Sequence, residues 1–342
     1  MTTAPYHLNQ YQHAYGAFLG ILIGDAIGAR LEFQTNPSAE AVVEALTMPG
    51  GGPFQVAPGQ FTDDGELTIC LARGLIYKPT FSLESIARFY SRWFYSQPFD
   101  MGNTTSQAFS AVPQDPPEST SCAALMIRSA QKNNMGSKAN GSLMRCVPLG
   151  IYGFKLSAED LHFLACRDSY LSHPNLACSH AVSLYILAVA SLIQKPGDST
   201  WALDRVQEQA KKVIPEVQEW LSLASKNVSV PYSPQEGFVK IAFIHAFRHL
   251  YQKTSWIEAL KETLSGGGDT DTNAGIICGL LGARDGINAL PEDYRQKVFK
   301  RSLSQGIPRP PFLSPKDLPE LVVLLLEKAP ERIEKGNTAK AT

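Results

Sequence analysis

Apolar residues recur at helical spacing through most of this 342-residue chain, and this periodicity constrains the fold more than any other feature. A period near 3.6 places them on one side of a helix, whereas the alternation typical of half-buried strands is nearly absent. Segments rich in Pro and Gly, which break helices, separate the periodic stretches. We therefore expect an all-α protein of about a dozen helices. The expected helices lie at 14–31, 67–76, 86–94, 119–132, 142–152, 157–170, 175–194, 200–225, 235–251, 255–264, 270–284, 291–303 and 316–328.

No composition shift, internal repeat or low-complexity block divides the chain. A chain of this length can bury a substantial core. We therefore expect residues 1–342 to form a single domain, with a short N-terminal arm at 1–13 and a frayed tail from about residue 332.

The overall composition excludes several classes of protein. Apolar residues make up 44% and charged residues 18%, which is too apolar and too weakly charged for a disordered chain. The 31 basic and 32 acidic side chains leave a formal net charge of -1. This balance gives no electrostatic reason to bind nucleic acid or an anionic membrane, so we expect neither as a partner.

The cysteines and the apolar runs indicate a cellular compartment. Six cysteines occur without a CxxC pair, and most lie in apolar stretches, as buried free thiols do in a reducing compartment. The first residues have neither a basic start nor an apolar core, so we expect no signal peptide. The longest apolar run, at 181–193, is shorter than the roughly 20 residues of a membrane span. We expect a soluble, cytoplasmic protein. Nothing in the sequence indicates oligomerisation, so we expect a monomer.

Two segments concentrate acids beside small residues. FTDDGELT at 61–68 carries Asp63, Asp64 and Glu66, and SGGGDTDTNAG at 265–275 carries Asp269 and Asp271. Each segment precedes an apolar helix, so helix capping is one interpretation, and Asp63 with Glu66 fits a capping box. A cap needs only one side chain, however, and each segment offers two aspartates and a threonine. Carboxylates gathered without compensation repel one another, which favours a bound cation.

The available ligand atoms narrow the choice of cation. Asp and Thr oxygens, with no Cys or His nearby, suit Mg²⁺, Mn²⁺ or Ca²⁺ rather than Zn²⁺ or copper. Four carboxylates and two hydroxyls exceed what one Mg²⁺ takes from a protein, and a pair of ions about 4 Å apart would use them better. The glycines at 266–268 favour either an anion site at the start of the next helix or a flexible connector. They match neither nucleotide-binding fingerprint.

With these residues in view, the sequence resembles the ADP-ribosylglycohydrolase family, whose bacterial prototype is the dinitrogenase reductase-activating glycohydrolase. The resemblance runs from about Ala14 to Arg284 and rests on several motifs in order. These are GAFLGILIGDAIGARLEF at 16–33, FTDDGELT at 61–68, FDMGNTT at 99–105, KANGSLMR at 138–145, DSYLSHPN at 168–175 and GGGDTDTNAG at 266–275.

The resemblance implies a compact, orthogonal multi-helix bundle with a central cleft that holds two divalent cations, Mg²⁺ or Mn²⁺. It implies as metal ligands Thr62, Asp63, Asp64, Asp269, Asp271 and Thr272. It places Glu32 and Asp100 near the scissile bond as general acid or base, with Asp63 and Asp269 acting from the metal site. It implies as substrate-binding residues Gly102, Asn103, Ser137, Asn140, Gly141, Ser142, His173, Gly267 and Gly268.

Several single residues allow a plainer interpretation. Many relatives have a threonine after the paired aspartates, whereas this chain has Gly65 followed by Glu66, so substrate contacts there are in question. We expect Asp25 to cap or bridge helices rather than to act in catalysis. We expect Arg145 to be a buried cation that pairs with an acid of the cleft. His173 could be a turn residue before Pro174 as well as a ligand contact.

The function implied is a metal-dependent hydrolase that removes ADP-ribose from modified protein side chains, with N-glycosidic ADP-ribosylarginine as the favoured substrate and ADP-ribose as product. Alternatives stay open. One is an immunity protein that reverses or blocks a cognate ADP-ribosyltransferase toxin. Others are a hydrolase of O-linked ADP-ribose, on serine or in O-acetyl-ADP-ribose, a two-metal phosphoesterase, and a non-catalytic relative.

Overall fold

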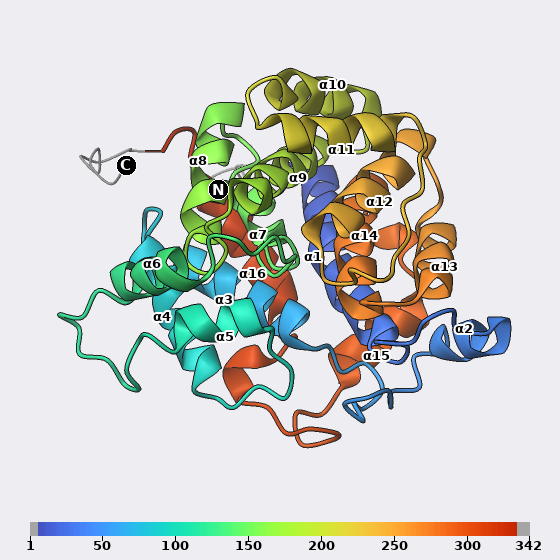
Figure 1. Cartoon of the computed structure of the whole chain (residues 1–342), viewed down its shortest axis with the longest axis horizontal. Helices are drawn as coiled ribbons and strands as arrows, with labels where there is room; N and C mark the ends of the chain where they lie inside the picture. Colours follow the sequence, from blue (N-terminus) through green and yellow to red (C-terminus); the bar gives the residue numbers. More distant parts are fainter. Residues whose placement is uncertain (1–5, 334–342) are drawn as a thin grey trace.

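The computed structural model describes residues 6–333, which form an all-α domain with sixteen α-helices, two short 3₁₀ helices and no strands apart from three isolated bridges (Figure 1). The helices are α1 (Leu8–Gly28), α2 (Ala39–Ala45), α3 (Asp63–Tyr77), α4 (Leu83–Phe94), α5 (Asn103–Phe109), α6 (Cys122–Asn133), α7 (Val147–Tyr152), α8 (Ala158–Ser169), α9 (Leu176–Gln194), α10 (Ser199–Ala210), α11 (Pro215–Ser225), α12 (Val239–Gln252), α13 (Trp256–Gly266), α14 (Thr270–Asp285), η1 (Ile287–Ala289), α15 (Glu292–Lys300), η2 (Pro311–Leu313) and α16 (Leu318–Glu327).

Helices α1 and α14 pack backbone against backbone in the middle of the molecule (Figure 1). From Gly16 to Gly28, α1 has a glycine at every fourth position, and these glycines face the backbone of α14 and of the residues just after it. A side chain at Gly20 would overlap the Cys278 carbonyl, and one at Gly24 would overlap that of Ala274. The pairing is antiparallel, because residues later in α1 meet residues earlier in α14. It therefore brings the end of α1 beside the start of α14.

The start of α3 is fixed to the same place by Asp25, near the end of α1. The Asp25 carboxylate accepts hydrogen bonds from the backbone N–H of Thr62 (2.9 Å) and of Gly65 (2.8 Å). It satisfies N–H groups that the first turn of a helix leaves free. The capping role expected for Asp25 is therefore confirmed, and three helix ends meet at one point.

The apolar helix α9 lies in the core. It is long and apolar enough to cross a membrane by length and composition, but 94% of its apolar window is buried inside the molecule. The sequence had indicated only a shorter apolar run there. Burial on all sides explains this composition, as for any helix surrounded by others.

The helix boundaries differ from the expected ones in several places, and α7 and α12 begin later than expected, at Val147 and Val239. The helix expected at 200–225 is two helices, because Pro215 disfavours a helical Ile214, whose ψ is 150°, and begins α11 instead. α2 and α5 lie in segments that showed no helical periodicity. α1 begins at Leu8, so residues 8–13 are helical rather than part of an arm. Residues 1–5 of that arm and 334–342 of the expected tail lie outside the described residues.

Candidate functional site

The two acidic segments, about two hundred residues apart in sequence, lie in contact. Asp63 and Asp64 occupy the first turn of α3, and Asp269 and Asp271 the start of α14. The Thr62 hydroxyl lies 3.3 Å from Asp64 Oδ2 and 3.4 Å from Asp271 Oδ2. Thr272 Oγ1 lies 3.4 Å from the same Asp64 oxygen. These contacts join four of the six residues predicted as metal ligands, and the other two, Asp63 and Asp269, line the cleft beside them.

A cleft of about 330 Å³ opens above this cluster. Among the residues that line it, carboxylates are frequent and lysine and arginine are absent. The lining carboxylates are Glu32, Asp63, Asp100, Glu236, Asp269 and Asp271. Oxygens of Glu32, Asp100 and Asp271 lie within 4.8 Å of one another. The two acids expected near the scissile bond are therefore in the cleft, beside the predicted metal ligands.

Burial and mutual repulsion perturb these acids strongly. Burial, followed by the charges of Asp100 and Asp269, raises the pKa of Glu32 to about 9. Burial and the Asp269 charge raise the pKa of Asp100 to about 6. Burial is also the main reason why the pKa values of Asp63, Asp64 and Asp271 are well above the usual range. The protein alone therefore does not compensate these charges.

The cluster fits divalent cations that prefer oxygen ligands. Glu32 Oε2 and Asp64 Oδ1 are buried and have no hydrogen-bond partner among residues 6–333. A buried carboxylate oxygen left unpaired is costly, so both atoms indicate a missing partner. Every ligand atom on offer at this point is a carboxylate or hydroxyl oxygen, as Mg²⁺ and Mn²⁺ prefer.

The opposite wall of the cleft comes from the segment at 138–145 and from His173. Asn140 donates from Nδ2 to Asp269 Oδ2 (2.7 Å) and so joins this wall to the acids. Gly141 has room only for hydrogen, because a Cβ there would lie 2.8 Å from the His173 ring. Burial and the Arg145 charge lower the pKa of His173 to about 3, so its imidazole is neutral. Ser142 is buried beneath this wall, and its hydroxyl lacks a partner.

Arg145 is a buried cation, as expected, but its partner is not an acid of the cleft. It donates from Nε to Asp168 Oδ2 (3.1 Å), and both side chains are fully buried. It also donates to the Ser172 hydroxyl (2.9 Å), which lies 2.8 Å from His173 Nδ1. The expected pairing was wrong: Arg145 pairs with Asp168 of α8, which does not line the cleft, and through Ser172 it supports the wall at His173.

The other predicted substrate-binding residues lie in different settings. Gly102 and Asn103, at the start of α5, line the cleft. Ser137 lies outside the cleft lining, with its hydroxyl 2.9 Å from that of Thr104. Gly267 and Gly268 donate their N–H groups to the carbonyls of Leu264 and Gln34, and they too lie outside the lining. Their binding roles stay predictions.

Two features of the site were not foreseen. Glu66 turns away from its aspartate neighbours, because Arg309 donates to it (2.7 Å) and so does the Trp93 indole (2.8 Å). Glu236 lines the cleft instead. It lies in a Pro-rich turn that gave no sign of function, and it reaches the cleft because Gly237 accepts a backbone hydrogen bond from Asn140 (3.0 Å).

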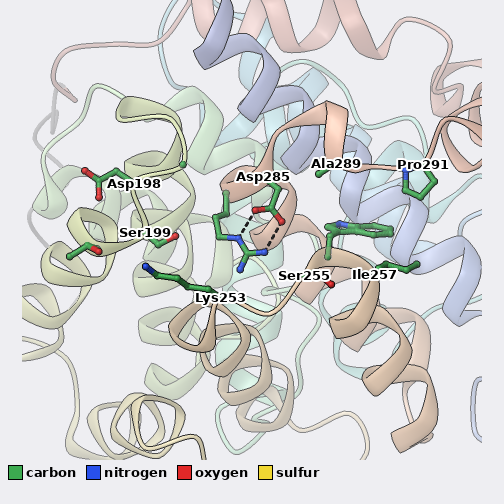
Figure 2. A pocket seen from close by; sticks show the side chains of 12 residues that line it. Asp198, Ser199, Lys253, Ser255, Ile257, Asp285, Ala289 and Pro291 are labelled. Atoms are coloured by element: carbon green, nitrogen blue, oxygen red, sulfur yellow. Dashed lines mark hydrogen bonds and ion pairs between the residues drawn. The ribbon is translucent and has the colours of Figure 1, made fainter.

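A larger hollow of about 790 Å³ lies elsewhere, between the starts of α10 and α13 and the end of α14 (Figure 2). It shares no lining residue with the acidic cleft. Its acids have partners: Asp285 pairs with Arg284 (2.6 Å), and Asp198 caps α10. The unpaired charges therefore mark the smaller cleft as the candidate site.

The fold and the cleft define a class of protein: an all-α domain in which the starts of α3 and α14 bring together carboxylates that fit divalent cations. The chain belongs to the ADP-ribosylglycohydrolase family, whose sequence profile matches residues 7–329. It is 28% identical over 291 residues to the ADP-ribosyl-dinitrogen reductase glycohydrolase of Rhodospirillum rubrum, covering 84% of this chain and 90% of that protein. It is 24% identical over 322 residues to the ADP-ribosylarginine hydrolase Tri1 of Pseudomonas putida, covering 92% and 82%. A solved ADP-ribosylglycohydrolase-related protein complex has the same fold, with a TM-score of 0.71 and 22% identity over 94% of this chain and 99% of that one.

Proposed function

We propose that this protein is a hydrolase that removes ADP-ribose from modified protein side chains and depends on two divalent cations, Mg²⁺ or Mn²⁺. The observation that carries the proposal is the cluster of uncompensated carboxylates from α3 and α14 in one cleft. Such a cluster binds cations, and cations so placed can hold the oxygens of a ribose and polarise water. Membership of the ADP-ribosylglycohydrolase family supports the choice of substrate.

We favour ADP-ribosylarginine as the substrate because of the charge of the cleft. Six carboxylates line it, and five of them carry a charge when Glu32 holds its proton, so two dications would offset four of these five charges. The remaining negative charge favours a cationic acceptor such as guanidinium over the neutral hydroxyl of serine. Phe33, which is 64% exposed, lines the cleft next to Glu32 and offers a ring face to such a cation. Two similar proteins are named for arginine-linked or dinitrogen reductase-linked substrates.

In the mechanism that we propose, separate groups of residues hold the cations, bind the diphosphate and transfer protons. When bound, the cations would supply Lewis-acid chemistry, held by Asp63, Asp64, Asp269, Asp271 and the hydroxyls of Thr62 and Thr272. The wall at Asn140 and Gly141 and the start of α5 bind the diphosphate. The remaining steps belong to the carboxylates of the cleft.

Cleavage at the anomeric carbon builds positive charge on the ribose, as in other glycosidases, and the cleft carboxylates stabilise it. Burial keeps a proton on Glu32, which it can give to the leaving side chain, and Asp100 is the alternative donor. Asp63 or Asp269 takes the proton of the attacking water.

The test is incubation with arginine-linked and serine-linked ADP-ribosylated proteins, with and without EDTA, and measurement of free ADP-ribose. We expect Mg²⁺-dependent release, faster from arginine, and its loss in Asp63→Ala and Asp269→Ala. Asp317→Asn is the matched control, because the Asp317 side chain is 47% exposed, pairs with Arg73 (2.8 Å) and does not line the cleft. Release of phosphate rather than ADP-ribose, or full activity of both alanine variants, would refute the proposal.

A further inference from the structure

A second group of metal-ligand side chains lies outside the cleft. Helix α12 carries His245 and His249, which are one helical turn apart and so share a face. Glu262 of the neighbouring helix α13 faces them. One nitrogen of each imidazole and one carboxylate oxygen lie within 4.8 Å of one another. His249 Nε2 is 4.0 Å from Glu262 Oε2.

The hydrogen bonds of the two histidines show which nitrogen of each imidazole carries the lone pair that could bind a metal. His245 Nε2 lies 2.9 Å from the Val230 carbonyl, which can only accept, so Nε2 carries the proton and Nδ1 the lone pair. That Nδ1 is buried, and no atom of the described part of the chain bonds to it. A metal-binding histidine commonly donates its other N–H to a backbone carbonyl in this way. Arg248, which can only donate, lies 3.2 Å from His249 Nε2, so the His249 lone pair is on Nε2.

Both imidazoles are neutral near pH 7, as metal binding requires. Burial lowers the pKa of His245 to about 4, against the opposing effect of its hydrogen bond to Val230 and with a smaller contribution from the Arg248 charge. Burial and the Arg248 charge lower the pKa of His249 to about 3. Both side chains are fully buried, whereas the Glu262 side chain is 43% exposed, so one edge of the group is open to ions from solvent.

In the structure, the Arg248 guanidinium lies between His249 and Glu262, where a metal ion would bind. It donates to both Glu262 and His249, but its Nε is buried without an acceptor. Its remaining partner is Asn227, at 3.4 Å in an exposed turn, which gives the side chain a path toward solvent. Arg248 is therefore a cation that contacts two potential metal ligands while its own hydrogen bonds are incomplete. We interpret it as a side chain that a metal ion can displace rather than as a fixed structural bridge.

We propose that His245, His249 and Glu262 form a second metal site, separate from the cleft, which takes Zn²⁺ or a similar transition-metal ion when Arg248 moves aside. Two imidazoles, one carboxylate and a water complete a tetrahedral zinc site, and imidazole ligands disfavour Mg²⁺. The site would tie α12 to α13. It adjoins the cleft through Tyr232, whose ring stacks on His245 at 4.1 Å and packs against Gly266, just before the Asp269 loop.

The test is a Co²⁺ titration of the full protein in saturating Mg²⁺, followed by visible absorption. Tetrahedral cobalt with imidazole ligands absorbs far more strongly than octahedral cobalt with oxygen ligands, so the cleft contributes little to the signal. We expect one equivalent with strong bands, which Zn²⁺ displaces, and no bands in His245→Ala or His249→Ala. Arg248→Gln should tighten Co²⁺ binding by about tenfold, since the competing cation is gone. His13→Gln is the matched control, because His13 contacts the Ala283 carbonyl at the other end of α14.

Two results would overturn the proposal. One is the absence of strong bands in the wild-type protein, and the other is their persistence in both histidine variants. Should the histidine variants fail to fold, Glu262→Gln and Arg248→Gln decide instead, because the Glu262 side chain is 43% exposed and glutamine keeps a polar side chain in place of Arg248. Glu262→Gln should weaken binding and Arg248→Gln strengthen it, and equal affinities in the two variants would refute the assignment. Because the readout is metal binding, it does not depend on the proposed hydrolase activity.

Discussion

Replacement of Arg145 by methionine should destabilise the protein more than most single substitutions, although Arg145 touches neither the predicted metal ligands nor solvent. Its partner Asp168 is fully buried and accepts from Arg145 Nε (3.1 Å) and from the Tyr90 hydroxyl (2.8 Å). Without the guanidinium, the carboxylate stays buried and uncompensated. Removal of one partner of a buried pair costs about 3–5 kcal/mol. The Ser172 hydroxyl also loses a donor at 2.9 Å, so the wall at His173 should loosen.

The assay is urea unfolding of Arg145→Met, Asp168→Leu and the double variant, followed by circular dichroism. Removal of both partners eliminates the uncompensated charge, so the double variant should recover most of the loss. Lys211→Met is the matched control. Its pair with Glu208 is about 70% exposed, and the change should cost less than about 1 kcal/mol. A loss below about 1 kcal/mol in Arg145→Met, or a double variant less stable than either single one, would refute the reasoning.

Three further predictions follow from other parts of the structure. Gly24→Ala should lower the free energy of unfolding in urea by about 1–3 kcal/mol and weaken Mg²⁺ binding, because the added Cβ would push α1 away from α14. An unchanged free energy and an unchanged Mg²⁺ affinity would contradict the close packing. Phe33→Ala should slow release from ADP-ribosylarginine about three- to fivefold and leave serine-linked release unchanged, as expected for loss of a cation–π contact; equal effects on both substrates would argue against it. In EDTA, the free energy of unfolding should fall as pH rises from 5 to 9. The pKa values of Asp25 (about 7) and Glu32 (about 9) in the folded protein exceed those in the unfolded chain, so the folded state holds these protons more tightly. The stability that this gives at low pH is lost as the pH rises through the folded-state pKa values, by on the order of 1 kcal/mol per pH unit. Saturating Mg²⁺ should flatten this slope, and an equal slope with and without Mg²⁺ would count against cation binding by the cluster.

The helices that the sequence predicted well are those that bury a regular apolar face. α9 and α14 coincide with their predicted ranges to within a residue or so, because almost every position in them is buried. α2 and α5 were missed because each has only seven residues, too few for a period near 3.6 to stand out. The single helix expected at 200–225 is in fact two, and apolar spacing alone does not reveal the break between them. Pro215 is the first residue of α11, a position where helices favour proline, so the apolar pattern continues across the break.

The acids of the cleft could be predicted because their chemistry is local. Two aspartates and a threonine within a few residues already exceed what a cap requires. Partners far apart in sequence could not be predicted in the same way. Glu66 belongs to the same acidic run as Asp64, yet Arg309, far along the chain, draws it out of the cluster. Glu236 reaches the cleft only through the backbone pairing of its neighbour Gly237 with Asn140.

The acidic cluster is a consequence of how α1 and α14 pack. Acids in the first turn of a helix are individually favourable, because they face the positive end of the helix dipole. The glycine face of α1 lets α14 approach at backbone contact, and Asp25 fixes the start of α3 to the same helix. Each step is locally stabilising, but together they force two acidic helix starts into contact. Among the described residues that line the cleft, no lysine or arginine offsets the resulting repulsion, and the neutral Asn140 amide that donates to Asp269 does not cancel a charge. Stability and cation binding should therefore be linked at this site: a substitution that separates α1 from α14 should lower the affinity for Mg²⁺ while it reduces the dependence of apo-protein stability on pH.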